Sequence, residues 1–243
     1  MTDNDNKIRI NKYLADNGVC SRRKADERIM DGRILVNGKP AQLGDKIDPA
    51  CDKVTFDGKD VLVSDAELEY WVLNKPVGVV STADDEQGRT KVTDLVKSKA
   101  RIYPVGRLDE NSEGLLLLTN DGELTNKLTH PSFEHIKSYR IIAKQNKSNS
   151  LSWIKRQFEA GIYIDGKKMQ AKVVTSIVKS PENGYLEIEL DLITGYNRQI
   201  RRMCDRIGLD VRKLSRTGFA NLKLSELNLE PGQAKRVQRS DII

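Results

Sequence analysis

Hydrophobic positions near the start of the chain recur at the spacing of a helix. The apolar stripe consists of Ile8, Ile10, Tyr13 and Leu14. It ends at Asn17-Gly18, a pair typical of a helix C-terminus, and Ser21 then stands where a helix N-cap belongs. We therefore predict a short helix that begins near Ile8 and a second helix over 22–30.

Short apolar runs bounded by turn residues dominate the rest of the chain, and they predict strands. Early runs lie at 34–36 and 54–56, with turns at Asn37-Gly38 and Gly44-Asp45. Beyond a link over 61–68, the predicted strands lie at 71–74, 115–118, 139–142, 162–164, 169–174, 177–179 and 186–192. Helical segments are predicted at 124–128, 150–160 and 198–207.

The order of these elements predicts the fold class and the domains. Helices do not alternate regularly with strands, which indicates an α+β fold with a largely antiparallel sheet instead of a series of βαβ units. The pattern changes at the link. We therefore predict a disordered lead over 1–6, a small domain over 7–64 and a larger domain over 65–243.

Charge points to a polyanionic partner. Lysine and arginine outnumber aspartate and glutamate by 41 to 35, which gives a formal net charge of +6. The excess is concentrated at 22–24 and again over 198–216. Clusters of this kind favour contact with nucleic acid, although a basic helix face is most often simply solvated.

Cysteine and histidine usage argues against a metal centre. The 3 cysteines are widely separated without Cys-x-x-Cys spacing, and there are only 2 histidines, so we expect neither a disulfide framework nor a metal site. The polar start of the chain lacks the apolar stretch of a signal peptide, and no apolar run approaches a membrane span. We expect a cytoplasmic monomer without membrane contact. The chain ends soon after Pro231-Gly232, and we expect no longer C-terminal extension.

One polar loop holds a candidate catalytic carboxylate. Asp109 lies between Gly106 and Gly114, directly ahead of the apolar run at 115–118. An aspartate in such a position is most often a turn or cap residue. A carboxylate in a polar loop just before a buried strand can also take part in chemistry.

Motifs on either side of this loop resemble one enzyme family. Lys75-Pro76-Val77-Gly78 precedes the loop, and Asn197 to Met203 follows it. In this order the motifs resemble the pseudouridine synthases, over about residues 8 to 227, and in particular the RsuA/RluB/RluE/RluF branch with its RluF type. The segments 21–25 and 32–38 resemble a small RNA-binding domain that is S-four-like.

The resemblance implies specific roles. It makes Asp109 the catalytic acid residue, pairs Arg201 with that carboxylate, and places Tyr139 against the target base. For Tyr139 the ordinary alternative is strand packing. The residues expected to contact the substrate are Lys75, Arg107, Arg198, Ile200 and Arg202. Arg107 would enter the RNA helix near an extruded nucleotide. The residues expected to contact RNA phosphates are Arg22, Arg23 and Lys24.

The function implied is isomerisation of a specific uridine in ribosomal RNA. We favour the 23S molecule and leave transfer RNA open as a further substrate. The product is an isomer, so no cofactor is expected, and the covalent route of the aspartate stays open. The alternative is a non-catalytic RNA-binding or ribosome-assembly protein, which would not need Asp109, Tyr139 and Arg201 together.

Two other enzyme classes lack their signatures. An RNA methyltransferase would need a glycine-rich cofactor loop after a strand, and the sequence offers none. The segment 161–168 nearly matches a phosphate-binding loop, but Lys168 replaces the Ser or Thr that would bind magnesium. Asp165-Gly166 within it predicts a hairpin turn.

Overall fold

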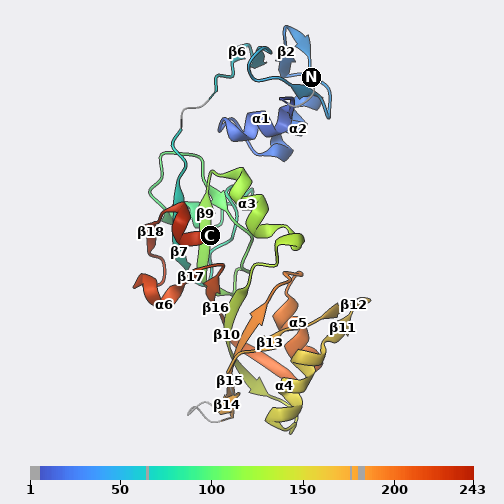
Figure 1. The fold of residues 1–243 in the computed structure, drawn as a ribbon, viewed down its shortest axis with the longest axis vertical. Coiled ribbons are helices and arrows are strands. Elements are labelled where there is room, and N and C mark those ends of the chain that lie inside the picture. Colours follow the sequence, from blue (N-terminus) through green and yellow to red (C-terminus); the bar gives the residue numbers. More distant parts are fainter. Residues whose placement is uncertain (1–5, 64–65, 176, 180–183) are drawn as a thin grey trace. The chain divides into compact units, whose positions relative to one another are not determined.

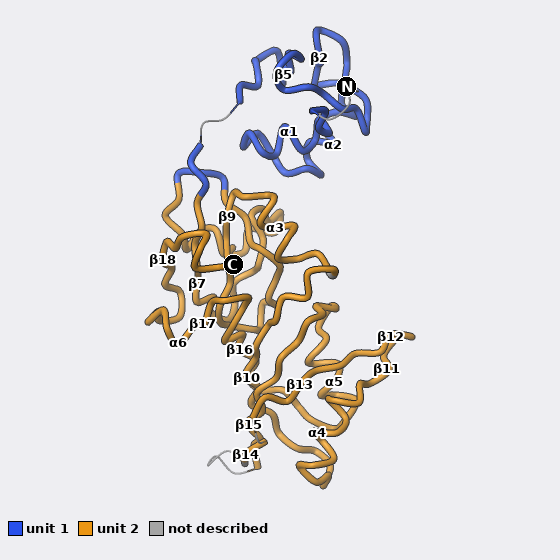
Figure 2. The backbone as a smooth tube through the Cα atoms, viewed as in Figure 1, with its two compact units in different colours: residues 1–68, 99–101 blue, residues 69–98, 102–243 orange. Residues whose placement is uncertain are grey.

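The computed structural model describes residues 6–63, 66–175, 177–179 and 184–243. They form two compact units, one of residues 1–68 with 99–101 and the other of residues 69–98 with 102–243 (Figure 2). The lead predicted over 1–6 lies outside the described residues except for Asn6.

The smaller unit combines two helices with short strands. Its elements are β1 (Ile8–Arg9), α1 (Ile10–Asp16), α2 (Arg22–Met30), β2 (Ile34–Val36), β3 (Lys39–Pro40), β4 (Lys46–Ile47), β5 (Val54–Phe56) and β6 (Lys59–Asp60). The first helix begins at Ile10, not near Ile8 as predicted, because Ile8 and Arg9 pair with β4. The predicted end is confirmed: Gly18 has a φ of 75°, which lets the Val19 amide donate to the Leu14 carbonyl at 3.0 Å.

The larger unit contains one large sheet of 10 strands and a separate two-stranded sheet (Figure 1). Its strands are β7 (Tyr70–Lys75), β8 (Tyr103–Pro104), β9 (Glu113–Thr119), β10 (Lys137–Gln145), β11 (Ile162–Ile164), β12 (Lys167–Met169), β13 (Lys172–Val173), β14 (Val178–Lys179), β15 (Tyr185–Leu192), β16 (Leu209–Phe219), β17 (Leu222–Lys223) and β18 (Ala234–Arg236). Its helices are η1 (Val92–Leu95), α3 (Gly122–Thr129), η2 (Pro131–Phe133), α4 (Leu151–Ala160), α5 (Gln199–Arg206), α6 (Leu224–Leu227) and α7 (Arg239–Ile242).

The sheet has the order β13-β15-β10-β16-β9-β7-β18, with β14, β17 and β8 added beside it. Among the described pairs of this sheet, β16 and β9 run parallel and the others run antiparallel. The predicted α+β fold with a largely antiparallel sheet is therefore confirmed. The strand predicted over 169–174 is wrong as a single element, since β12 ends at Met169 and pairs with β11, whereas β13 joins β15.

Strand β9 explains why the sheet has a core on each face. Leu115 and Leu117 pack into a cluster with α3, while Leu116 and Leu118 pack with Leu73 on the opposite face. All four leucines of β9 are fully buried, as their period of two along the strand requires when both faces are covered. The strand that follows the candidate loop is therefore a rigid support for it.

Candidate active site

The loop that carries Asp109 is fixed at its first residues by packing and by a hydroxyl. Leu108 is buried in the cluster that contains Leu73 and Leu116. The Ser81 hydroxyl donates to the Leu108 carbonyl at 2.8 Å and accepts from the Leu108 amide at 3.1 Å. The Ser112 amide closes the turn by donating to the Asp109 carbonyl at 3.0 Å.

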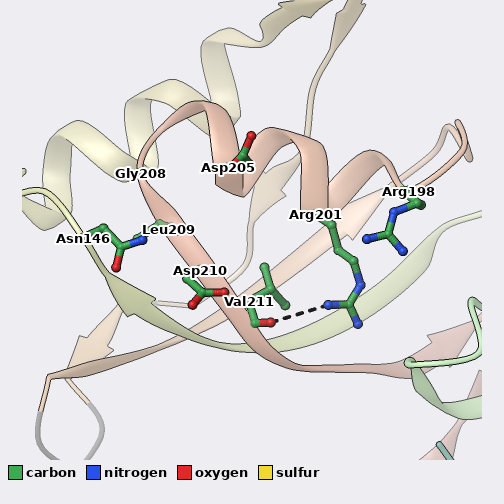
Figure 3. A pocket seen from close by; sticks show the side chains of 8 residues that line it. All are labelled: Asn146, Arg198, Arg201, Asp205, Gly208, Leu209, Asp210 and Val211. Carbon is green, nitrogen blue, oxygen red and sulfur yellow. Dashed lines mark hydrogen bonds between the residues drawn. The ribbon is translucent and has the colours of Figure 1, made fainter. Parts of the chain in front are cut away.

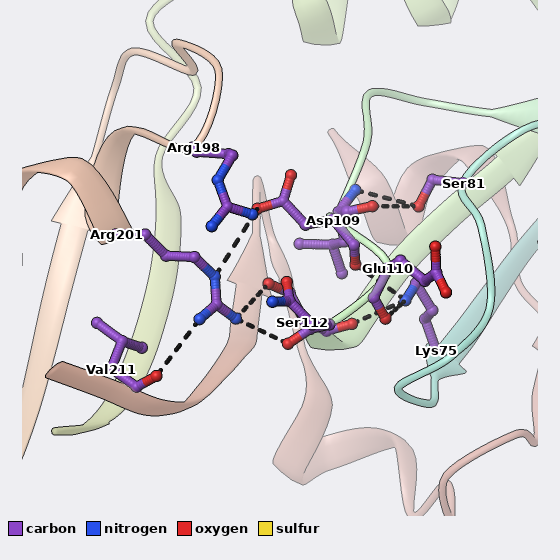
Figure 4. A network of polar contacts seen from close by, with 10 residues as sticks. Lys75, Ser81, Asp109, Glu110, Ser112, Arg198, Arg201 and Val211 are labelled. Atoms are coloured by element: carbon purple, nitrogen blue, oxygen red, sulfur yellow. Dashed lines mark hydrogen bonds and ion pairs between the residues drawn. The ribbon is translucent and has the colours of Figure 1, made fainter.

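Lys75 holds the underside of the same loop. Its side chain is fully buried, and its ammonium donates to the carbonyls of Pro76, Asp109, Glu110 and Ser112 at 3.0, 3.2, 3.4 and 2.7 Å (Figure 4). Burial lowers the pKa of Lys75 to about 8. The predicted contact between Lys75 and the substrate is therefore corrected. The ammonium donates its hydrogen bonds to carbonyls of the loop and is not exposed at the surface.

Gly114 marks the point where the loop joins the sheet. Its φ is 104°, and a Cβ built there would lie 2.3 Å from the Arg216 carbonyl oxygen on β16. Glycine alone fits this close parallel contact between β9 and β16. The glycine-bounded loop is thus fixed at its far end by backbone geometry as well.

Two arginines face the Asp109 carboxylate (Figure 4). Its Oδ2 lies 3.7 Å from Nη1 of Arg198 and 3.9 Å from Nε of Arg201, and the Asp109 side chain is 30% exposed. Arg198 occupies the N-cap of α5 with a left-handed φ of 50°, and its side chain points toward the loop (Figure 4). A cleft of about 420 Å³ opens at this point, lined by Val77, Gly78, Asp109, Glu110, Asn111 and Arg198.

Arg201 is held in place by the loop that it faces. Its Nη2 donates to the Asn111 carbonyl at 2.7 Å and to the Ser112 hydroxyl at 3.2 Å, and its Nη1 donates to the Val211 carbonyl at 3.5 Å. The Nε atom is buried without a hydrogen-bond acceptor among the described residues and faces Asp109. Burial and the nearby Arg198 lower the pKa of Arg201, while Asp109 opposes that shift. The Arg201 guanidinium is therefore fixed by three acceptors, with its Nε side turned to the Asp109 carboxylate.

A second hollow lies behind the same arginines (Figure 3). It measures about 250 Å³ and is lined by Asn146, Arg198, Arg201, Asp205, Gly208, Leu209, Asp210 and Val211. Cys204 on α5 is fully buried in the apolar core, and burial raises the pKa of its thiol to about 12. That thiol stays protonated at neutral pH and cannot serve as a nucleophile.

The other predicted site residues lie at different places. Tyr139 is half-buried on β10 and packs against two core clusters, the one that contains Leu108 and the one around α4 and α5. Arg107 is exposed two residues before Asp109. Ile200 is only 4% exposed and belongs to the apolar core around α4 and α5, which corrects its predicted contact with a base.

Arg202 does not join the other arginines of its helix. It forms an ion pair with Asp165 in the turn between β11 and β12. The prediction placed both Arg198 and Arg202 in contact with the substrate. Of these two residues, Arg198 at the N-cap of α5 lies near Asp109, whereas Arg202 is paired with Asp165.

The basic cluster of the smaller unit lies in the first turn of α2. The predicted N-cap is confirmed, since the Ser21 hydroxyl accepts from the Lys24 amide at 3.2 Å. Arg22 and Arg23 are exposed and Lys24 is half-buried. Two cations therefore lie at the N-terminus of α2, where the helix dipole stabilises negative and not positive charge.

Sequence reasoning missed the residues that build the loop. Ser81 and Ser112 received no role, and Lys75 received the wrong one. Ser112 stands inside the Asp109 motif, so its position was a usable signal. No local sequence signal pointed to Ser81, because its contact with Leu108 joins residues that are 27 positions apart.

The described residues contain neither a cluster of metal ligands nor a helix that could span a membrane. No three His, Cys, Asp or Glu side chains gather there as ligands of a metal ion. No described helix has the length and apolar character needed to cross a membrane.

Comparisons with known proteins agree on one family. The RNA pseudouridylate synthase family matches residues 69–206, and the S4 domain matches residues 8–54. The chain is 39% identical over 226 residues to the dual-specificity RNA pseudouridine synthase RluF of Escherichia coli K12, covering 93% of this chain and 74% of that protein. It is 42% identical over 240 residues to the ribosomal large subunit pseudouridine synthase B of Bacillus subtilis, covering 95% of each.

A solved structure gives the same result. A crystal structure of a pseudouridylate synthase superposes with a TM-score of 0.65 at 25% identity, covering 97% of this chain and 98% of that one. The predicted resemblance and the S-four-like domain are confirmed. The chain belongs to the RNA pseudouridylate synthase family, as an RNA pseudouridine synthase whose catalytic domain follows an S4 domain.

Proposed function

We propose that this enzyme converts a specific uridine of large-subunit ribosomal RNA to pseudouridine, with Asp109 as the catalytic group. The observation that carries the proposal is the carboxylate of Asp109, 3.7 Å from Arg198 and 3.9 Å from Arg201 at the edge of a cleft. The name of the Bacillus subtilis relative supports the large subunit as the source of the RNA.

In this reaction the bond from C1′ of the ribose to N1 of uracil breaks, and a bond from C1′ to C5 forms. The proton on C5 leaves and N1 gains one, so atoms and electrons balance without a cofactor. Asp109 acts as base or nucleophile at the ribose, and the two arginines stabilise negative charge beside it. Tyr139 offers a ring for stacking and a hydroxyl for the proton on C5.

Access to the base requires that the nucleotide leave the RNA stack. Arg107 is exposed on the loop that carries Asp109, which suits insertion into the space that the nucleotide vacates. We favour large-subunit RNA as the substrate. Transfer RNA is tested as a second substrate, because one relative is named a dual-specificity enzyme.

The test measures tritium release from transcripts that contain 5-tritiated uridine. Large-subunit, small-subunit and transfer RNA are incubated separately with the full chain, and pseudouridines are then mapped by primer extension. We expect release from the large-subunit transcript at one position, which is unmodified in cells that lack the gene. Tight RNA binding without release from any transcript would instead support a non-catalytic assembly protein.

Arg201 provides a graded prediction. Arg201→Ala is expected to lower kcat by about 10²-fold, since it removes a buried charge and the donors to Asn111 and Ser112. Arg201→Lys keeps the charge and should retain part of the activity. Single-turnover assays measure both, with Arg206→Ala as the control because Arg206 is exposed on the same helix. Equal rates for the Lys and Ala variants would remove Arg201 from the mechanism.

The smaller unit is expected to supply electrostatic affinity. Replacing Arg22, Arg23 and Lys24 together by alanine should weaken RNA binding and flatten the slope of log affinity against log salt. The change is about 0.9 for each lost phosphate contact in a duplex. Turnover at saturating RNA should persist, because Asp109 belongs to the other unit.

Filter binding at several salt concentrations measures this slope. The control replaces the exposed Lys39, Lys46 and Lys59 of the same unit, which removes the same charge from its strands. An equal slope change in both triple variants would mean that charge in general, and not the first turn of α2, makes the contact.

A further inference from the structure

The connection between β15 and α5 brings Arg198 to the active site. It runs over 193–198, and each of its residues is exposed. Its last residue, Arg198, has a φ of 50° and places Nη1 3.7 Å from Oδ2 of Asp109 (Figure 4). An exposed connection holds a side chain in one position only where contacts tie it to the interior. The next residue along the chain, Gln199, makes such contacts.

Gln199 is the first residue of α5, and it is only 3% exposed. Its Oε1 accepts from the Thr194 hydroxyl at 2.9 Å and from the Tyr196 amide at 3.1 Å. Its backbone amide donates to the Tyr196 carbonyl, also at 3.1 Å. One buried residue therefore holds the middle of the connection by three hydrogen bonds.

The other half of the Gln199 carboxamide is fixed to the interior of the unit. Its Nε2 donates to the Gln170 carbonyl at 3.5 Å and lies 4.0 Å from Sδ of Met203 on α5. The Tyr196 amide can only donate and the Gln170 carbonyl can only accept, so the two ends of the carboxamide are not interchangeable. A carboxylate of the same shape would set two acceptors against each other at Gln170.

Both ends of the connection have attachments of their own. Nζ of Lys137, the first residue of β10, donates to the Ile193 carbonyl at 3.0 Å. At the other end, the Arg198 carbonyl accepts from the Arg202 amide at 2.9 Å in the first turn of α5. Removal of the Gln199 side chain would therefore free the stretch just before Arg198, while the strand and the helix stay attached.

The backbone of Arg198 makes this support necessary. A residue other than glycine pays a free-energy cost at positive φ, and it keeps that conformation only while the surrounding contacts impose it. The attraction between Arg198 and Asp109 weakens as the guanidinium moves away into solvent, where distance and water both reduce it.

We propose that Gln199 is a positioning residue for Arg198. Its carboxamide holds the connection so that the Arg198 guanidinium faces Asp109 before RNA binds. Gln199 is buried and acts through Arg198. The inference rests on the proposed function, which gives Arg198 its part in stabilising charge beside Asp109. A glutamine that served packing alone would affect stability and would not depend on Arg198.

The test is a double-mutant cycle on single-turnover tritium release with the full chain and saturating large-subunit transcript. Arg198→Ala is expected to lower the rate about 10²-fold. Gln199→Met fills the space without the hydrogen bonds and should also lower it about 10²-fold. The double variant should be no slower than Arg198→Ala, because nothing is left to position. Independent roles would multiply to a loss of about 10⁴-fold, and that result would overturn the inference.

Gln145→Met is the matched control. Gln145 is half-buried at the last residue of β10, and its Nε2 donates to the Asn149 carbonyl at 2.6 Å. The substitution removes the same kind of contact between a glutamine and a loop elsewhere in the unit. It should leave the rate at the wild-type value, and a loss equal to that of Gln199→Met would overturn the inference.

Thr194 gives a milder variant that keeps the test decisive if Gln199→Met does not fold. Thr194 is exposed, and Thr194→Val removes one hydrogen bond to Gln199 while keeping the shape of the side chain. The rate should fall about fivefold, and only where Arg198 is present. Thr194→Ser keeps the hydroxyl and should match the wild type. Equal rates for the Val and Ser variants would count against the anchor.

Hydrogen exchange measures the anchor without turnover. The Tyr196 amide donates to Gln199, so a peptide that covers 193–199 should exchange faster in Gln199→Met than in the wild type or in Gln145→Met. Unchanged exchange in Gln199→Met would overturn the inference. A wild-type chain that shows this protection but isomerises no uridine would support the anchor and defeat the proposed function alone.

Discussion

Asp109→Asn is expected to abolish uridine isomerisation while RNA binding changes little. The amide keeps the shape of the carboxylate but loses its charge, its basicity and its power as a nucleophile. Removal of a group at the centre of a catalytic set typically lowers kcat by about 10⁴-fold or more. Single-turnover tritium release from the large-subunit transcript measures the rate, and filter binding of the same RNA measures affinity.

The neighbouring Glu110 offers a matched control. Its carboxylate is exposed and lies 3.7 Å from Arg89, away from the arginines that face Asp109. Glu110→Gln makes the same chemical change one residue along the same loop and should retain most of the activity. Equal losses in the two variants would indicate that the loop tolerates no amide, and the assignment of Asp109 as the catalytic group would fail.

The contrast between Asp109 and Glu110 shows which features could be predicted from the sequence and which could not. Burial of all four residues from Leu115 to Leu118 follows directly from a continuous apolar run bounded by turns, and it is observed. Asp109 was selected by its glycine-bounded loop and by resemblance, since composition alone does not separate it from Glu110. Its closeness to Arg198 joins residues 89 positions apart, and local pattern carries no information on such contacts.

Helix periodicity was a poor guide to the arginines of α5. A regular helix would place Arg198 and Arg202 on one face. Arg198 is the N-cap, outside the regular helix that begins at Gln199, and Arg202 pairs with Asp165 in the turn of a hairpin. Both effects depend on tertiary structure, and for that reason only one of the two arginines reaches the carboxylate.

Burial of Lys75 is the clearest departure from expectation. Lysine is seldom fully buried, so an exposed contact was the reasonable prediction for the Lys75-Pro76-Val77-Gly78 motif. The loop that ends at Ser112 turns several carbonyls inward, and only a cationic donor satisfies them together. A lysine at position 75 is therefore explained by the backbone carbonyls of a loop that lies far away in the sequence.

Lys75→Met is expected to disturb both activity and stability. Methionine fills the space but donates no hydrogen bond, so carbonyls of Asp109, Glu110 and Ser112 lose their partner. A buried group left without a partner costs about 2 kcal/mol in the free energy of unfolding. A shift of the carboxylate of about 1 Å lowers kcat by about 10²-fold. Thermal melts and single-turnover rates measure the two effects.

The pH dependence of stability separates this role from a general packing defect. The pKa of Lys75 is about 8 in the folded chain against 10.5 ordinarily, so the unfolded chain binds more protons between these values. The cost of burying the charge is fully present below pH 8 and is relieved as the pH rises toward 10.5. The stability advantage of the wild type over Lys75→Met should therefore widen across this window.

Lys235→Met is the control. Lys235 is exposed on β18, which pairs with β7, and the loop carbonyls accept from Lys75 instead. It should match the wild type in rate and in melting temperature at each pH. A constant difference between the wild type and Lys75→Met from pH 8 to 10.5 would show that Lys75 is not charged and bonded to the loop in the way its contacts imply. In that case the position of Asp109 would depend on Leu108 and Ser81 instead, and Ser81→Ala would be the variant that lowers the rate.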